Sequence, residues 1–274
     1  MVTLTKDEII KALDAFEIEG DSILLVHSSL KALGYIEGGA DTVIDALHET
    51  IPNGTLVMPT LSQKNWETVF EDWTLDRPSD TGLITEVFRC REGSLRSDNA
   101  THSVAASGPL AADIVGGDPK GGARPGIFGD YCFSSESPWQ RMFDSRSRYG
   151  VRAYVMFWGC TMKYNTYKHF SEYRLVERAL GAVTDPEKRK ELFEMISRYG
   201  NTEGKLWPWY DSSAFQLTLE EMGIAKKISL GQGEIICCDI FDAVSAVDAA
   251  LDSEPEKLLK YTIVDWLKET GYIA

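Results

Sequence analysis

The first sixty residues alternate strand and helix patterns, and this alternation limits the chain to few folds. Ser22–His27 is a nearly continuous apolar run, which is typical of a strand buried on both faces. Asp41 can cap a following helix, and Thr55–Pro59 predicts the next strand after a turn at Pro52–Gly54. A strand, a helix and a strand within about forty residues indicate a βαβ unit with two parallel strands.

The rest of the chain continues this theme less regularly. Thr5–Glu8 has the form of a capping box and predicts a helix in front of the first strand. Further helices are expected over 82–89, 109–115, 166–180, 186–199, 212–222, 243–251 and 256–270, and strands over 103–106, 152–158 and 234–240. Segment 116–129 contains six glycines and two prolines, which predicts a long loop or lid.

No composition break or internal repeat divides the 274 residues. The prediction is therefore an α/β fold in one domain over 1–274. Its central sheet would be mainly parallel or mixed, flanked by helices and carrying helical insertions. A chain of this length can bury a sizeable core without disulfides or metals.

The charge balance excludes several classes of partner. Lys and Arg number 28 against 42 Asp and Glu, which gives a net charge of −14. Nucleic acids and anionic membranes attract basic surfaces, so we expect neither as a partner. The sequence shows no leader-like start and no apolar run of about 20 residues that could span a membrane.

The five cysteines form no CxxC pair and their number is odd. This spacing favours neither a disulfide framework nor a zinc site. We therefore expect reduced thiols, a cytoplasmic location and no bound metal.

The first candidate site follows the first predicted strand. His27, Ser28, Ser29, Leu30 and Lys31 stand at its carboxyl end, where loops of open α/β sheets expose backbone N–H groups and bind ligands. Small serine side chains let a phosphate come close, and Lys31 would add local positive charge. An ordinary strand-to-helix turn capped by a serine explains the same residues. No Walker or GxGxxG motif is present that would favour a phosphate site over this alternative.

Two polar segments are weaker candidates. Segment 96–103 contains hydroxyl side chains that can hold a ligand and His102, whose imidazole can titrate near neutral pH. Trp66–Trp73 mixes acidic and aromatic residues that would suit a cationic ligand. A solvated surface loop has a similar composition in both cases.

The third candidate site lies after the late strand predicted at 152–158. His169 and Glu172 are three positions apart at the start of a predicted helix, so they share one face. A carboxylate beside an imidazole fixes its tautomer and strengthens it as a general base. The alternative is that His169 and Glu172 are an ordinary pair on the surface of a helix.

Cys160, near His169 in sequence, is a possible nucleophile, although a cysteine at the end of a strand more often serves only in packing.

Together these motifs resemble the aminoglycoside N3-acetyltransferase family, antibiotic acetyltransferases unrelated to the GNAT fold. The similarity is colinear from about residue 24 to about residue 251, nearly the whole chain. It is carried by His27–Leu30, Gly38–Gly39, Gly54–Leu56, Met58–Thr60, 82–89, Arg96–Ser97, Thr101–Ala106, Ser137–Pro138 and the segment with Asn165, Thr166, His169 and Glu172.

The resemblance implies direct transfer of an acetyl group from acetyl-CoA to the 3-amino group of a 2-deoxystreptamine aminoglycoside. His169 would be the general base, and Glu172 would orient it or contact the substrate. Asn165 would help to bind the substrate, while Thr166 and Ser103 would lie near the thioester or pantetheine. The loop His27–Lys31 would hold the CoA pyrophosphate through backbone N–H groups.

The chain also departs from the family pattern. The family usually has Arg-Ser-x-His-Pro where this chain has Arg96–Ala100, and Leu-His-Tyr-Ala-Glu where it has Lys168–Glu172. The base and its carboxylate are retained while neighbouring residues change. The resemblance therefore indicates acyl transfer more directly than it indicates which amine is acetylated.

Three other functions stay open. The acceptor could be a biosynthetic amine, the protein could be a Cys160/His169 hydrolase, or it could bind ligands without catalysis.

CoA is itself polyanionic, so the net charge cannot recruit it. Lys31 and Arg96, with backbone N–H groups after Val26, would have to bind CoA locally. The acidic surplus would then favour a polycationic amine.

Overall fold

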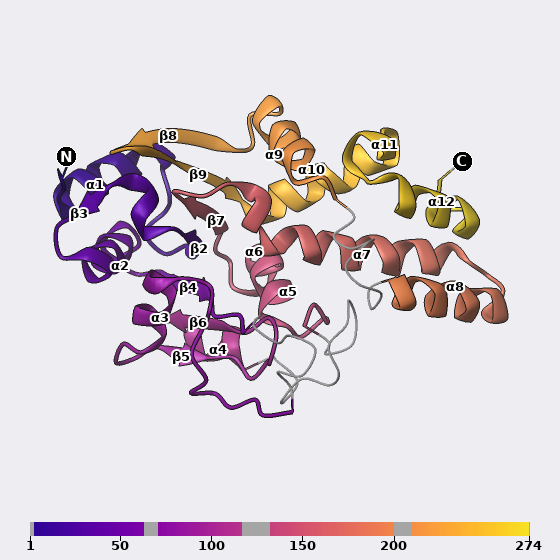
Figure 1. Cartoon of the computed structure of the whole chain (residues 1–274), viewed down its shortest axis with the longest axis horizontal. Helices are drawn as coiled ribbons and strands as arrows, with labels where there is room; N and C mark the ends of the chain where they lie inside the picture. The colour runs from indigo at the N-terminus through magenta and orange to yellow at the C-terminus, as the bar shows by residue number, and fades with distance from the viewer. Residues whose placement is uncertain (1–2, 63–70, 117–131, 200–209, 274) are drawn as a thin grey trace.

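The computed structural model contains a seven-stranded mixed sheet (Figure 1). It describes residues 3–62, 71–116, 132–199 and 210–273. The strand order is β5-β6-β4-β2-β7-β9-β8. The bounds are β2 Ile23–Ser28, β4 Thr55–Pro59, β5 Leu95–Arg96, β6 Val104–Ser107, β7 Ala153–Trp158, β8 Lys226–Leu230 and β9 Gly233–Asp239. Separately, β1 (Thr3–Leu4) and β3 (Tyr35–Ile36) form a small parallel pair.

Strand β2 lies at the centre of the sheet, parallel to β4 on one side and to β7 on the other. The outer pairs β4–β6, β5–β6, β7–β9 and β8–β9 are antiparallel. This arrangement confirms the expected α/β fold with a mixed sheet. The carboxyl ends of β2, β4 and β7 meet at one edge. The chain runs from β2 to β4 on one side and returns later to β7 on the other side. Ligands of open α/β sheets bind at such a switch point.

The continuous apolar pattern of β2 follows from burial on both faces. Ile23 and Leu25 pack into one hydrophobic core, while Leu24 and Val26 pack into the other, and all four are fully buried. Because side chains alternate along a strand, the two faces need apolar residues at every position.

Helices cover the two faces of the sheet (Figure 1). Three helices cover the first face and contribute buried residues to the hydrophobic core that contains Leu24. They are α1 Lys6–Leu13, α2 Gly39–Thr50 and α3 Leu83–Arg89. The core of Ile23 contains residues of α4 Ala111–Val115, α5 Pro138–Phe143, α7 Thr166–Ala182, α8 Pro186–Tyr199, α9 Ser212–Glu221, α10 Ile240–Ser253, α11 Pro255–Leu258 and α12 Tyr261–Thr270. A short helix, α6 (Ser145–Arg148), follows α5.

Several predicted elements are confirmed and some need correction. The capping box at Thr5 is present. Helix α2 is not capped by Asp41, because it begins at Gly39 after Gly38 in left-handed conformation, and Asp41 instead pairs with Arg91. The single helix predicted over 256–270 is two helices, since extended Leu259 forms a β-bridge with Tyr210.

Strand β8 was not predicted. Four of its five residues are at least partly exposed at the sheet edge, so its sequence lacks an apolar run. The predicted loop or lid at 116–129 lies outside the described residues after Gly116, as do residues 66–70 of the acidic-aromatic segment. Within the described ranges, no helix combines the length and apolar character needed to cross a membrane.

Candidate active site

His169 and Glu172 form a hydrogen-bonded pair on the first turns of α7. Nδ1 of His169 lies 2.8 Å from Oε2 of Glu172. The side chain of Glu172 is fully buried, whereas that of His169 is 18% exposed. The other carboxylate oxygen, Oε1, accepts a hydrogen bond of 2.9 Å from the backbone N–H of Tyr210. Glu172 is therefore fixed from two sides and holds the imidazole in one orientation.

The start of α7 explains why this pair is rigid. Oδ1 of Asn165 accepts a hydrogen bond of 2.9 Å from the N–H of Tyr167 and caps the helix. Thr166 is buried as the first helical residue. Lys168 is buried as well, and its Nζ donates to Oγ of Ser212 at 2.8 Å. Burial lowers the pKa of the Lys168 ammonium, although the charge of Glu172 opposes this shift.

A second imidazole lies beside the first. The ring centroid of His102 is 6.5 Å from that of His169, in an edge-on arrangement. Oδ1 of Asn99 accepts hydrogen bonds from the backbone N–H groups of Thr101 and His102 and shapes the turn. Trp139 Nε1 donates to the carbonyl oxygen of His102 at 3.1 Å. His102 was only a weak sequence candidate, because its proximity to His169 depends on the tertiary fold.

His27 is the third histidine, of the four in the chain, that lies in this region. It lies near the carboxyl end of β2, on the same face as Ile23, and stacks on Phe157 of β7, with ring centroids 5.3 Å apart and planes at 8°. Burial lowers the pKa of His27 to about 3, and the nearby charge of protonated His169 contributes to this shift. The ring is therefore neutral at physiological pH. Its Nε2 has no hydrogen-bond partner among the described residues.

The loop after β2 only partly matches its expected role. The backbone N–H of Ser29 donates to the carbonyl oxygen of Trp158 at 2.8 Å, so it is not available to a pyrophosphate. Leu30 and Lys31 begin a short 3-10 helix, η2 (Leu30–Leu33), and Lys31 is exposed. Ser28 pairs with Trp158 across β2 and β7, and within the described chain neither Ser28 Oγ nor Trp158 Nε1 has a hydrogen-bond partner.

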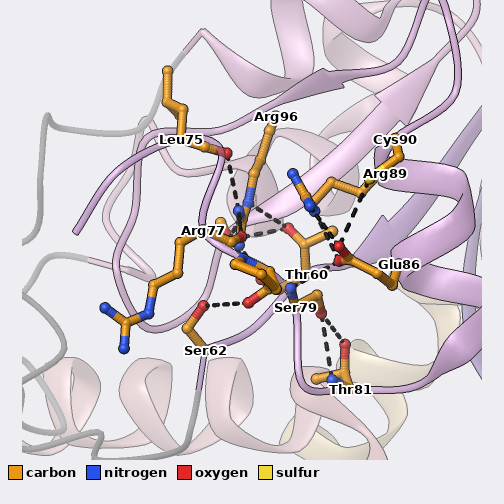
Figure 2. Close-up of polar contacts among 12 residues, drawn as sticks. Thr60, Ser62, Leu75, Arg77, Ser79, Thr81, Glu86, Arg89, Cys90 and Arg96 are labelled. Carbon is orange, nitrogen blue, oxygen red and sulfur yellow. Dashed lines mark hydrogen bonds and ion pairs between the residues drawn. The ribbon is translucent and has the colours of Figure 1, made fainter. Parts of the chain in front are cut away.

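Ser103 belongs to a structural network centred on Arg96. Oγ of Ser103 lies 3.0 Å from Oγ1 of Thr60 and 3.2 Å from Nε of Arg96. Figure 2 shows Arg96 between Thr60 and the segment of Leu75 and Arg77, whose carbonyl oxygens accept from its guanidinium. Ser103 itself is fully buried. Its predicted position near the thioester is neither supported nor opposed by these contacts.

The contacts of Arg96 do not favour the expected role in CoA binding. All three guanidinium nitrogens donate to protein oxygens, and the group lies over the ring of Trp73 at 4.6 Å. Trp73 in turn donates to Asp98 at 2.9 Å. Burial lowers the pKa of Arg96 to about 10, which still leaves it charged. Its charge therefore stabilises two loops next to the site.

Cys160 does not have the properties of a nucleophile. Its Sγ lies 3.6 Å from the carbonyl oxygen of His27, the geometry of a weak hydrogen bond. Burial raises the pKa of the thiol to about 12, so the reactive thiolate is nearly absent at neutral pH. These properties oppose the hydrolase hypothesis.

The fold thus brings His27, His102, His169 and Glu172 to one edge of the sheet, with Asn165 and Thr166 at the adjoining helix start. Lys31 is not part of this group and lies exposed on η2. The group can accept and return a proton at His169, and it offers a further neutral imidazole at His27. Such an arrangement suits a reaction that deprotonates a nucleophilic substrate.

Comparison with known proteins agrees with this interpretation. The family described as Aminoglycoside 3-N-acetyltransferase matches residues 25–252. The chain is 26% identical over 276 aligned residues to the SPbeta prophage-derived aminoglycoside N(3')-acetyltransferase-like protein YokD of Bacillus subtilis, covering 90% of both. It is 27% identical over 231 residues to aminoglycoside N(3)-acetyltransferase III of Salmonella sp, covering 76% of this chain and 72% of that protein.

Solved structures show the same fold. Aminoglycoside acetyltransferase AAC(3)-IVa, as apoenzyme, superposes with a TM-score of 0.69 at 20% identity, covering 98% of this chain and 99% of that one. The binary complex of AAC-IIIb with CoASH superposes with a TM-score of 0.68 at 18% identity, covering 92% and 97% of the two chains.

Proposed function

Because the chain belongs to the aminoglycoside 3-N-acetyltransferase family, we propose that it transfers an acetyl group from acetyl-CoA directly to an amino group of an aminoglycoside. The hydrogen-bonded pair of His169 and Glu172 is the observation that carries this proposal. The similar protein AAC-IIIb has been solved with CoASH, which supports acetyl-CoA as the acyl donor. No metal is required for this chemistry.

His169 acts as the general base. A neutral amine that attacks a thioester must give up one N–H proton to become an amide, so a base must lie beside the attacking nitrogen. Glu172 holds Nδ1, which directs proton transfer to Nε2. Both carboxylate oxygens have partners within the protein, so Glu172 acts mainly by positioning the imidazole. Asn165 serves the site by capping α7, and substrate contact through Asn165 or Thr166 is a secondary part of the proposal.

The proposed acceptor is the 3-amino group of a 2-deoxystreptamine ring. A mutant of AAC(3)-IVa has been solved in complex with apramycin and with a gentamicin, and the charge of −14 suits a polycationic ligand. A biosynthetic amine is the second candidate acceptor. Asn99 and Ala100 favour it, because they replace the family's usual His-Pro at the turn that carries His102.

The proposal places the activity in one catalytic domain over 1–274, in the cytoplasm where acetyl-CoA is available. A role in antibiotic resistance follows only if aminoglycosides are the best acceptors. The loop around Ser28, Leu30 and Lys31 remains the proposed CoA-binding segment, without a contribution from the N–H of Ser29.

The test is release of the CoA thiol from acetyl-CoA over a panel of aminoglycosides and simple amines. We expect turnover with aminoglycosides and a fall in kcat of about 10²- to 10⁴-fold in His169→Ala, while acetyl-CoA binding stays measurable by calorimetry. His48→Gln is the matched control, since His48 lies on α2 at the other face. Unchanged turnover in His169→Ala would exclude it as the base. Binding without thiol release by the wild type would identify a non-catalytic binding protein.

A further inference from the structure

His27 has an unsatisfied hydrogen-bonding nitrogen on the sheet face that packs against α7, the helix of the proposed base. The residue is 6% exposed, and Nε2 has no hydrogen-bond partner in the described part of the chain. Buried polar atoms are nearly always paired in native proteins, so an unpaired one needs an explanation. The carbonyl oxygen of His27 is used by Cys160, which leaves the side chain as the unexplained group.

We propose that Nε2 of His27 donates a hydrogen bond to the acyl carbonyl oxygen of acetyl-CoA and stabilises the negative charge that develops there during transfer. This inference rests on the proposed function, because it requires a thioester at the site. It makes His27 a catalytic residue and not only part of the segment that holds the cofactor.

The position of His27 fits this role. It stands at the carboxyl end of β2, the central strand, where ligands of this sheet type bind. It lies on the sheet face that packs against α7, the helix that carries His169. Stacking on Phe157 at 5.3 Å fixes the plane of the ring. A donor held in this way needs no reorganisation when charge develops, which is the requirement for effective stabilisation of an oxyanion.

The reaction gives the two histidines separate tasks. The nitrogen of the neutral amine bonds to the carbonyl carbon, the carbonyl electron pair moves to oxygen, and His169 takes one proton from the nitrogen. The oxygen then re-forms the carbonyl while the C–S bond breaks with its electrons on sulfur. The sulfur takes the proton from His169, so the products are an amide and the CoA thiol. His27 donates to the oxygen throughout and exchanges no proton.

The protonation state of His27 suits a permanent donor. Burial, with the charge of His169, depresses its pKa to about 3, so the ring is neutral at physiological pH. A neutral imidazole has one N–H and one acceptor nitrogen. The proposed role requires that the N–H be on Nε2.

The test compares three variants at His27 with acetyl-CoA and the panel acceptor that the wild type turns over fastest. His27→Leu removes the donor, and we expect kcat to fall by about 10²- to 10³-fold with little change in the KM for acetyl-CoA. His27→Gln places an amide N–H near the position of Nε2 and should recover much of this loss. His27→Asn, which places its amide near Nδ1, should not. Thermal unfolding of each variant reports whether the fold is retained.

The outcomes separate this inference from the proposed function. If the wild type turns over and His27→Leu keeps the same kcat, or differs only in KM, the proposed role of His27 is overturned and the proposed function is not. Equal rates in His27→Gln and His27→Asn also overturn it, and this comparison remains usable if His27→Leu does not fold. A wild type without thiol release on any acceptor overturns the proposed function, and this inference with it.

Discussion

Glu172 shows how a single buried carboxylate can organise the site. It is fully buried, yet both of its oxygens have partners, His169 on its own helix and the backbone of Tyr210 from another segment. A buried charge is tolerated when it is paired and hydrogen-bonded in this way. The orientation of His169 therefore depends on a segment that lies 38 positions further along the chain from Glu172.

We expect Glu172→Gln to lower kcat by at least about 10²-fold. The glutamine must turn its NH₂ group toward either His169 Nδ1 or the Tyr210 N–H, so one of these contacts is lost or the imidazole changes tautomer. The measurement is steady-state kcat with acetyl-CoA. Glu177→Gln is the matched control, because Glu177 lies exposed on the same helix. Equal rates for the two variants would remove Glu172 from the site.

Cys160 gives a residue-scale prediction about pH. Its pKa is raised to about 12, so the thiolate forms only as pH approaches that value, and alkylation at neutral pH should be slow. Iodoacetamide labelling followed by mass spectrometry should modify exposed Cys90 first. Cys160→Ala should keep wild-type turnover. Rapid labelling of Cys160, or an acyl-enzyme on it, would support the nucleophile hypothesis instead.

The site was predicted from sequence only where its residues are local. His169 and Glu172 share a helical turn, so their spacing alone indicates contact. His27, His102 and His169 come from three distant segments, and nothing in their sequence positions shows that they converge. The saturation of Arg96 by carbonyl oxygens could not be predicted for the same reason, since its partners belong to loops of irregular structure.

At the scale of the element, α7 links helix capping to the site. Asn165 caps this helix one turn before His169. Loss of a cap costs about 1 kcal/mol of unfolding free energy and frays the first turn, which carries Thr166 and the base.

We therefore expect Asn165→Ala to lose about 1 kcal/mol in urea unfolding and to reduce kcat. Asn165→Asp keeps a capping oxygen and should keep most of both. The pair also tests direct substrate contact. If Asn165→Asp is as stable as the wild type but inactive, the amide of Asn165 does more than cap the helix.

Helices and strands with a clear hydrophobic period in the sequence were predicted, whereas element boundaries that depend on tertiary contacts were not. The buried strands β2, β4 and β7 and the long helix α7 match their predicted ranges closely. The break between α11 and α12 depends on the bridge of Leu259 to Tyr210, which local propensity does not contain. Asp41 was a reasonable cap by residue type, but its carboxylate pairs with Arg91 in space.

At the scale of the whole molecule, the charge of −14 should affect the two substrates differently. A polycationic amine is attracted by the summed field, which salt screens over about 10 Å at 0.1 M. CoA must bind against that field through local contacts. Raising the salt concentration in calorimetry should therefore weaken amine binding more than CoA binding. The opposite order would show that long-range charge does not select the acceptor.

The central pairing of β2 with β7 has a consequence for how the protein folds. Ile23 pairs with Ala153, so the strand that contains His27 pairs with β7 only after a very long loop of chain has closed. Loop closure of this kind makes non-local strand pairing slow relative to helix formation. During refolding, far-ultraviolet circular dichroism should recover before CoA binding does. Competence to bind substrate is then a late event, and partly folded chains should carry helices without a working site.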